Sequence, residues 1–334
     1  MGFPSLMQDK SQFTDKASDP ISPHRTRNTL RMMAAWTVVG ASLCVMFYHQ
    51  TRWLAPVHSH SYGAFQGSSL GTFSSSYIGK WDLDRSWKPR VLSNYLGRLA
   101  TSGDREHFAH KAALWAASWL AAMFCLYLAF FGKDSILFIL GTYCGLAFGY
   151  MPGIACRLYP WDMPATFFFA LFVCFLHRNR LMLFLPILPV AVLFKETSAI
   201  LCVGYLFLDA TRNRRLATFA TAATLALLGK GVGHLLSQTA MGSDTNLTLI
   251  ASNIGYVLHH VGPLGINAGL LVALAILPVT SRNGWTLRVI AVLFAFGVMT
   301  NAVVYEYRIW FELVPISLYA LHANLFANNQ EVQT

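Results

Sequence analysis

The chain has 334 residues, of which 55% are hydrophobic and 12% are charged, and its mean hydropathy is +0.45. Its apolar residues fall in repeated blocks of roughly 16 to 20 residues, the length of a helix that crosses the hydrocarbon core of a bilayer. This composition excludes a soluble domain and predicts an all-α, polytopic transmembrane bundle. The formal net charge of +10 is explained by basic residues in cytoplasmic loops, which orient membrane helices, so we expect no nucleic acid as a partner.

The N-terminal part begins with a polar segment, residues 1–31, whose composition predicts a disordered cytoplasmic tail. The apolar run 32–48 follows basic residues, as in a signal peptide, but no convincing small-residue cleavage site comes after it. We therefore expect a retained first membrane helix rather than a cleaved signal. The transmembrane domain would then extend over residues 32–327, and residues 328–334 would form a cytoplasmic C-terminal tail.

Residues 49–110 form a long hydrophilic segment and are predicted to be the first loop on the outer face. The stretch 90–101 places apolar residues at near-helical spacing, which predicts a helix lying on the membrane surface. The decapeptide 81–90 before it holds most of the loop's charge, including Asp82 and Asp84.

Nine further apolar spans bring the predicted total to about ten. They are expected at residues 112–131, 135–151, 162–176, 181–194, 197–209, 216–236, 264–280, 287–304 and 309–326. The six cysteines lie in or beside these blocks without the spacing of metal ligands, so they are predicted to be apolar packing residues.

The region 181–209 allows a second interpretation, because Pro186 and Pro189 could kink one continuous helix. A single helix would place Lys195 and Glu196 in the middle of the bilayer and would invert every later loop. We favour two short spans, which leave these two residues slightly below the outer surface in a recess lined by protein.

The positive-inside rule supports this topology, since the loops assigned to the cytoplasm are rich in basic residues. Those residues are Lys133, Arg178, Arg180, Arg212, Arg214, Arg215, Arg282 and Arg288. The short outer loops hold Arg157, Lys195 and Arg308, which have Asp162, Glu196 and Glu306 nearby, respectively. Paired exceptions of this kind indicate a site on the outer face, with both chain termini in the cytoplasm.

The outward polar residues suit a substrate whose phosphate lies at the headgroup level and whose lipid tail runs between helices. Arg or Lys would bind the phosphate, a carboxylate would act as a base, and aromatic faces would contact a sugar ring. This pattern predicts glycosyl transfer from a polyprenyl-phosphate sugar donor. Candidate substrate-binding residues are Arg90, Arg157, Tyr159, Asp162, Lys195, Lys230, Glu306 and Arg308, and candidate catalytic acids are Asp82, Asp84 and Glu196.

Some of these residues have structural explanations as well. Asp162 could cap the N-terminus of the fourth span, since Pro164 follows it. Lys230 lies four residues before His234 on one face of the seventh span, where snorkelling accounts for it equally well. Asp82 and Asp84 could pair with neighbouring basic residues in a solvated loop.

The motifs and their order resemble the GT-C superfamily of polytopic glycosyltransferases that use lipid-linked donors, with a long first outer loop, a surface helix and many spans. Over roughly residues 75–320 the chain also resembles a widespread group of bacterial integral membrane proteins. The residues that carry this likeness are Arg157-Leu-Tyr-Pro-Trp-Asp162-Met-Pro164, then Lys195-Glu196-Thr197, then Glu306-Tyr-Arg308 followed by Pro315.

This resemblance implies a catalytic base in the first loop, Asp82 or Asp84, and a location in the bacterial inner membrane. A divalent cation held by this Asp-x-Asp pair is left open, and no other metal site or cofactor is expected. The implied partners are a lipid-linked sugar donor, a glycan, lipid or protein acceptor, and membrane lipids. Three alternatives stay open: a polysaccharide polymerase or ligase, a transporter or flippase, and a non-catalytic subunit of a cell-envelope polysaccharide system.

Overall fold

The architecture is that of a computed structural model, which describes residues 90–101, 108–136, 139–142, 161–237, 250–255, 272, 275, 281–301 and 307–330. Within these ranges the chain is helical apart from short turns, and it contains no strand. The prediction of an all-α protein is therefore confirmed for this part of the chain. The predicted tail 1–31, the run 32–48 and most of the loop 49–110 lie outside the described residues.

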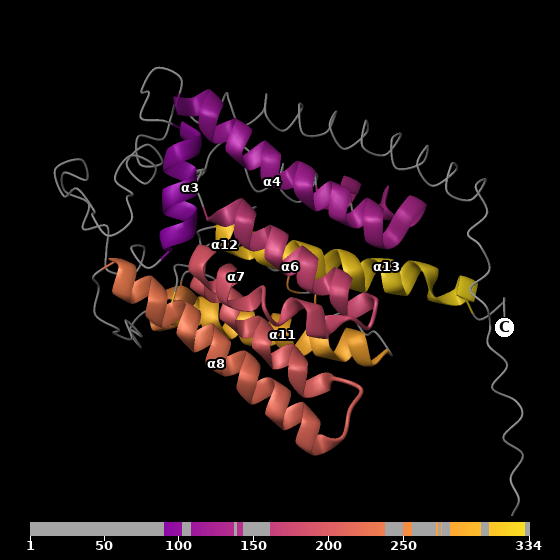
Figure 1. Ribbon diagram of the computed structural model, residues 1–334. Coiled ribbons are helices and arrows are strands. Elements are labelled where there is room, and N and C mark those ends of the chain that lie inside the picture. Colours follow the sequence, from indigo (N-terminus) through magenta and orange to yellow (C-terminus); the bar gives the residue numbers. More distant parts are fainter. Residues whose placement is uncertain are drawn as a thin grey trace, which may run out of the picture.

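The described elements pack into a bundle of helices (Figure 1). In chain order they are α3 (Val91–Thr101), α4 (Phe108–Phe131), η2 (Gly132–Ser135), α6 (Asp162–His177), η3 (Leu181–Phe184), α7 (Leu188–Phe194), η4 (Glu196–Phe207), α8 (Arg212–Ser237), α11 (Arg282–Asn301), α12 (Tyr307–Trp310), η5 (Phe311–Leu313) and α13 (Val314–Gln330). The elements named η are 3-10 helices.

Three of these helices are long and apolar enough to cross a membrane: Leu114–Phe131 within α4, Arg212–Leu236 within α8 and Arg282–Thr300 within α11. With 24 residues, α4 rises about 36 Å, more than the roughly 30 Å of a hydrocarbon core. Large apolar side chains point out of the bundle, as on a surface that faces lipid; on α8, Leu227 and Leu235 are 64% and 77% exposed. The described part of the chain thus contains three candidate membrane spans, and the total of about ten stays a prediction.

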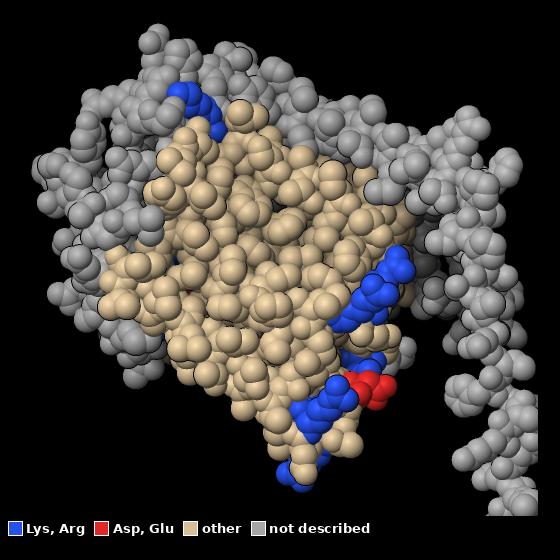
Figure 2. All heavy atoms as spheres, viewed as in Figure 1, with Lys and Arg blue, Asp and Glu red and all other residues tan. Residues whose placement is uncertain are grey.

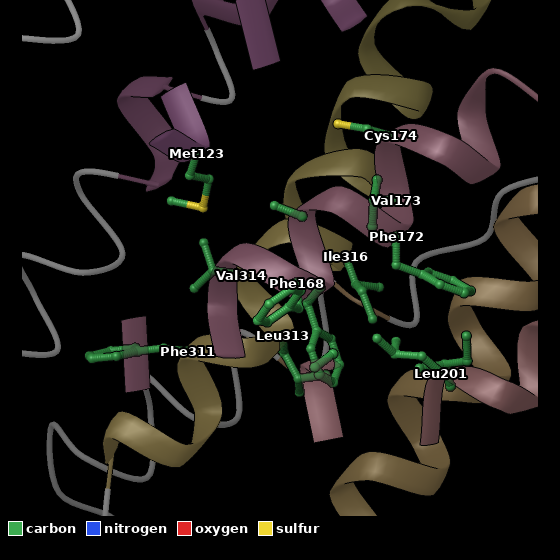
Figure 3. Packing of buried hydrophobic residues seen from close by; sticks show 14 of the residues in the cluster. Met123, Phe168, Phe172, Val173, Cys174, Leu201, Phe311, Leu313, Val314 and Ile316 are labelled. Carbon is green, nitrogen blue, oxygen red and sulfur yellow. The ribbon is translucent and has the colours of Figure 1, made fainter. Parts of the chain in front are cut away.

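The central helix of the bundle is α6, which is apolar around its circumference and buried on most of it, with Phe167, Leu171 and Phe175 half-buried along one face. Phe169 of α6 packs edge-on against Phe294 of α11, with 5.7 Å between ring centroids. Phe168 of α6 and Leu313 of η5 belong to the same buried cluster (Figure 3). Because Asp162 is the first residue of α6, this core places its carboxylate at one end of the bundle.

The opposite end of α6 lies where several basic segments meet. Arg178, directly after α6, donates a hydrogen bond to the carbonyl of Phe130 near the end of α4. Asn283 at the start of α11 donates to the carbonyl of Leu176 at 3.2 Å. We call this the basic end, and its exposed cations are Arg178, Arg180, Arg212, Arg214 and Arg282. Figure 2 shows most of the visible Lys and Arg towards this end and a further group near the opposite end. The five cations named here therefore lie at one end of the bundle, and the side of a membrane that this end faces stays a prediction.

Residues 181–207 form a hairpin. Lys195, between α7 and η4, has an extended backbone with φ −158° and ψ 128°, which ends α7. The chain then returns, because the Tyr205 hydroxyl near the end of η4 donates a hydrogen bond of 3.1 Å to the carbonyl of Leu181 at the start of η3. The interpretation as two short segments is therefore confirmed over one kinked helix, and Lys195 lies at the hairpin tip.

The returning segment η4 is a 3-10 helix of 12 residues, which the sequence pattern did not predict. A 3-10 helix rises about 2.0 Å per residue instead of 1.5 Å, so this segment covers about 24 Å instead of about 18 Å. The extra length lets a short segment return from the tip to the basic end.

The helix α3 covers the end of the bundle that lies opposite the basic end. We call the end under α3 the cluster end, after the cluster of charged side chains described below. It contacts α4, α7 and α8 and runs transverse to α4, α6 and α13 (Figure 1). The predicted helix at 90–101 is thus confirmed, with an orientation that suits a helix lying along a membrane surface.

One prediction needs correction. The N-cap position of α6 is occupied by Trp161 without a side-chain capping bond, and Asp162 lies in the first turn, because its carboxylate is directed to Lys195 instead. At the C-terminus, α13 continues to Gln330 and so includes the first residues of the tail 328–334, whose cytoplasmic location stays a prediction. Most of the predicted spans 135–151 and 264–280 lies outside the described residues.

Candidate functional site

Three charged side chains meet at the cluster end and are sealed from solvent. The Lys195 ammonium nitrogen lies 3.3 Å from Asp162 Oδ1 and 2.5 Å from Glu312 Oε1. The exposed fraction of the side chain is 3% for Lys195 and 0% for both carboxylates. Burying a single charge at this depth costs on the order of several kcal/mol, so each group depends on the others. We call these residues the buried trio.

Each member of the buried trio comes from a different element. Lys195 lies at the hairpin tip, Asp162 in the first turn of α6, and Glu312 in η5. The first turn of a helix favours a carboxylate, because its free N–H groups carry partial positive charge. The second oxygen of Glu312 accepts a hydrogen bond of 2.5 Å from the Thr197 hydroxyl. Glu312 therefore holds the hairpin tip on both sides of Glu196.

A second ion pair lies beside the trio and joins α3 to the hairpin tip. The Arg90 guanidinium donates from Nε to Glu196 Oε2 at 2.7 Å and from Nη2 to Glu196 Oε1. This bidentate geometry is the strongest arrangement of Arg with a carboxylate. The Arg90 side chain is 11% exposed, but that of Glu196 is 36% exposed. Among the charges of the cluster, this pair is therefore the one that a ligand can reach.

Arg90 is held by more than its partner. Its guanidinium carbon lies 4.7 Å from the centroid of the Trp161 ring, a cation–π contact. Burial alone would lower the pKa of Arg90, but the carboxylates of Glu196, Asp162 and Glu312 more than offset this effect, so its pKa lies above the ordinary value. The guanidinium is thus permanently charged and fixed in orientation.

The surface helix is fastened to the hairpin tip at a second point. The Ser93 hydroxyl donates a hydrogen bond of 2.5 Å to the carbonyl of Phe194, the last residue of α7. The last carbonyls of a helix lack partners within the helix, so this bond satisfies one of them. Together with Arg90, it fixes one turn of α3 over the tip.

The structure thus brings together four of the residues predicted for the site: Arg90, Asp162, Lys195 and Glu196. Lys230 lies on α8, half-buried, and makes no ion pair with the cluster among the described residues. Arg308 lies in α12, one turn before Glu312, but its side chain is outside the described part. The other predicted residues, Asp82, Asp84, Arg157, Tyr159 and Glu306, lie outside the described residues.

Glu312 was not among the predicted site residues. The sequence interpretation chose Glu306 and Arg308 from their Glu-x-Arg pattern and counted Glu312 as part of the apolar span 309–326. The signal that could have found it is a lone carboxylate inside an apolar block, because such a charge is costly unless it has a partner or a function.

The described part of the chain holds no group of three or more His, Cys, Asp or Glu residues that could bind a metal ion. The carboxylates of the cluster are instead engaged by Lys195 and Arg90. A divalent cation stays a hypothesis tied to Asp82 and Asp84.

The described residues form a helical bundle that contains three helices long and apolar enough to span a membrane and that buries a network of ion pairs at one end. Comparisons with protein-family models, with curated proteins and with solved structures gave no match. The likeness to the GT-C superfamily therefore rests on the sequence motifs alone, and what it implies is a proposal.

Proposed function

We propose that this protein is a membrane glycosyltransferase that moves a sugar from a polyprenyl-phosphate donor to an acceptor hydroxyl. The observation that carries the proposal is the partly exposed Arg90–Glu196 pair, held under a transverse helix at one end of an apolar bundle. The pair supports the proposal because a cation shaped for phosphate lies beside a carboxylate that can accept a proton. In the proposed orientation both groups would lie at the level of the headgroup of a lipid-linked donor.

In this reaction the bond between the sugar C1 and the donor phosphate oxygen breaks, and the phosphate keeps the electron pair. The acceptor oxygen bonds to C1, and its proton passes to a carboxylate. Arg90 stabilises the negative charge that develops on the leaving phosphate, and Glu196 accepts the proton. Asp82 and Asp84 are the alternative bases, and Arg157, Tyr159, Glu306, Arg308 and Lys230 are further candidates for contacts with donor or acceptor.

The proposed orientation follows from the two ends of the bundle. The basic end would face the cytoplasm together with both termini, and the cluster end would face the outer side of the inner membrane. The acceptor would be a glycan, lipid or protein on that outer side.

A second candidate function is ion-coupled transport, and the buried trio is the observation that favours it. Charged residues inside a membrane bundle often form proton or ion pathways. Transport would predict movement of a solute or proton across sealed vesicles without formation of a new glycoside, so one assay for each activity on the same vesicles separates the two functions.

The test is transfer of radiolabelled sugar from a panel of polyprenyl-phosphate sugars into membrane lipid or polymer by protein reconstituted in vesicles. Wild type is compared with Glu196→Gln, Asp82→Asn and Asp84→Asn at matched amounts of folded protein. Loss of the base should lower kcat by about 10²–10⁴-fold. The matched control, Asp209→Asn, removes a carboxylate that pairs with Arg282 at the basic end and should leave transfer unchanged.

Two results would count against the proposal. If wild type transfers sugar and all three carboxamide variants keep full activity, the assignment of the site is wrong. If wild type forms no labelled product with any donor while solute or proton movement is observed, the transport function replaces glycosyl transfer.

A further inference from the structure

We infer that the donor phosphate displaces Glu196 from Arg90, and that this exchange of partners is what frees the base. The inference rests on the proposed function for the identity of the ligand. Its starting point is that each member of the pair masks the other. A carboxylate held by an arginine is a poorer base, because the ion pair stabilises its charged form, and an arginine held by a carboxylate is a poorer phosphate ligand.

In the cluster, the Arg90–Glu196 pair can exchange its partner for a ligand, whereas the buried trio cannot. Lys195 is enclosed by Asp162 and Glu312 at 0–3% side-chain exposure, so no ligand reaches it without unfolding the hairpin tip. The Glu196 side chain is 36% exposed, so in the proposed exchange an anion would approach the guanidinium from the side of Glu196. Phosphate oxygens fit the two donors of a guanidinium in the same fork geometry as a carboxylate does.

Arg90 is positioned to remain when Glu196 leaves. Its guanidinium rests on Trp161 at 4.7 Å, and Ser93, three residues later, is bonded to the carbonyl of Phe194. Neither contact involves the Glu196 carboxylate. The arginine would therefore present a fixed, bidentate site to the incoming phosphate.

Glu196 in turn can move only its side chain. The residues on both sides of it are held by Glu312, Lys195 through its ammonium group and Thr197 through its hydroxyl, each at 2.5 Å. After the exchange, the Glu196 carboxylate would therefore stay close to the phosphate bound to Arg90. In the proposed reaction, the acceptor hydroxyl loses its proton beside this phosphate.

The exchange closes as a cycle. The donor phosphate takes Arg90, Glu196 accepts the acceptor proton as the new glycosidic bond forms, and the leaving phosphate keeps the electron pair of the broken bond. Glu196 then gives its proton to water and returns to Arg90 as the lipid phosphate leaves. In the resting state, the ion pair thus holds the Arg90 guanidinium and the Glu196 carboxylate in place. After the reaction, Glu196 competes with the lipid phosphate for Arg90 and so helps to release the product.

The consequence is a binding prediction that does not need turnover. Farnesyl phosphate serves as a short-chain probe, and its affinity for the purified full-length protein in detergent is measured by isothermal titration calorimetry. Because Glu196→Gln removes the competing carboxylate, this variant should bind the probe about tenfold more tightly than wild type, a gain of about 1.4 kcal/mol. Asp209→Asn, which frees Arg282 at the basic end, is the matched control and should leave the affinity unchanged.

Further arms identify what is recognised. Arg90→Lys keeps the charge but loses the fork, so it should weaken binding of farnesyl phosphate at least tenfold, and the gain from Glu196→Gln should disappear in the Arg90→Lys background. A similar gain with inorganic phosphate at lower affinity would show that the headgroup chemistry is sufficient. A gain restricted to farnesyl phosphate would show that the lipid is required as well.

Weaker or unchanged binding of farnesyl phosphate by Glu196→Gln would overturn the exchange, because the carboxylate would then not be a competitor. An equal gain with farnesol, which lacks the phosphate, would also overturn it. Failure of the proposed function is a separate result: tighter binding by Glu196→Gln without sugar transfer by wild type leaves a phosphate-exchange site in a protein of another activity.

Discussion

Replacing Lys195 by Met tests whether the buried trio is one coupled unit. Methionine has a similar length and no charge, so the change removes the ammonium group that lies between Asp162 and Glu312, whose side chains have 0% exposure. Removing one partner of a buried ion pair costs about 3–5 kcal/mol, because the remaining charge stays buried. We expect Lys195→Met to lower the free energy of unfolding by about this amount.

Glu312→Gln is the complementary change. Lys195 keeps Asp162 as a counter-charge, but the glutamine amide replaces one acceptor oxygen by a donor, so either the ammonium or the Thr197 hydroxyl loses its acceptor. The expected cost is about 1–3 kcal/mol. In the double variant Lys195→Met/Glu312→Gln the uncompensated carboxylate of Glu312 is gone, so the combined cost should fall short of the sum by about 1–3 kcal/mol.

The assay is unfolding of the purified protein by SDS in mixed micelles, followed by circular dichroism. Asp209→Asn is the control, because it breaks the exposed pair with Arg282, whose N–O distance is 2.8 Å and whose side chains are 45% and 88% exposed for Arg and Asp, respectively. An exposed pair contributes less than about 1 kcal/mol. Costs that add within about 0.5 kcal/mol, or a Lys195→Met cost no larger than that of the control, would refute the coupling.

Two further predictions concern packing and orientation. A Cβ at Gly229 would lie 2.8 Å from the carbonyl oxygen of Pro189, so Gly229→Ala should push α8 from α7 and cost about 1–3 kcal/mol, whereas Gly231→Ala, with open space at its Cβ, should stabilise the protein by up to about 1 kcal/mol in the same titration. Equal effects would contradict the close contact. In a background without native cysteines, Arg214→Cys should react with a membrane-impermeant maleimide in inverted vesicles and not in spheroplasts, and the reverse result would place the basic end outside.

The helices that could be predicted from the sequence are those whose pattern is local. The spans in α4 and α8 follow from long apolar blocks, and α3 follows from the spacing of its apolar residues. The hairpin was predicted from Pro186, Pro189 and the polar pair Lys195-Glu196, together with the requirement that the basic loops lie on one side of the membrane. The 3-10 form of η4 has no such local signal, because apolar periodicity does not distinguish 3-10 from α over a short buried segment.

The site could be predicted only in part, because its contacts join distant parts of the chain. Arg90 and Glu196 are 106 residues apart, and Thr197 and Glu312 are 115 apart. The predicted topology correctly placed Arg90 and Glu196 at the same end of the bundle, but it could not show that they form an ion pair. Glu312 could not be predicted from its neighbours in the sequence, because it lies in an apolar block and its partner Lys195 is distant in the chain.

The buried trio is not accounted for by stability alone. Apolar residues that fill the same volume are often equally stable or more stable, by about 1–4 kcal/mol, because they avoid the desolvation of charges. Apolar packing would not provide the directional contacts that hold the hairpin tip, in which Lys195 and Thr197 both bind Glu312. These contacts fix the backbone of Glu196 between Lys195 and Thr197. In the proposed exchange only the Glu196 side chain would have to move, so the sealed trio would set the geometry in which the exposed pair exchanges.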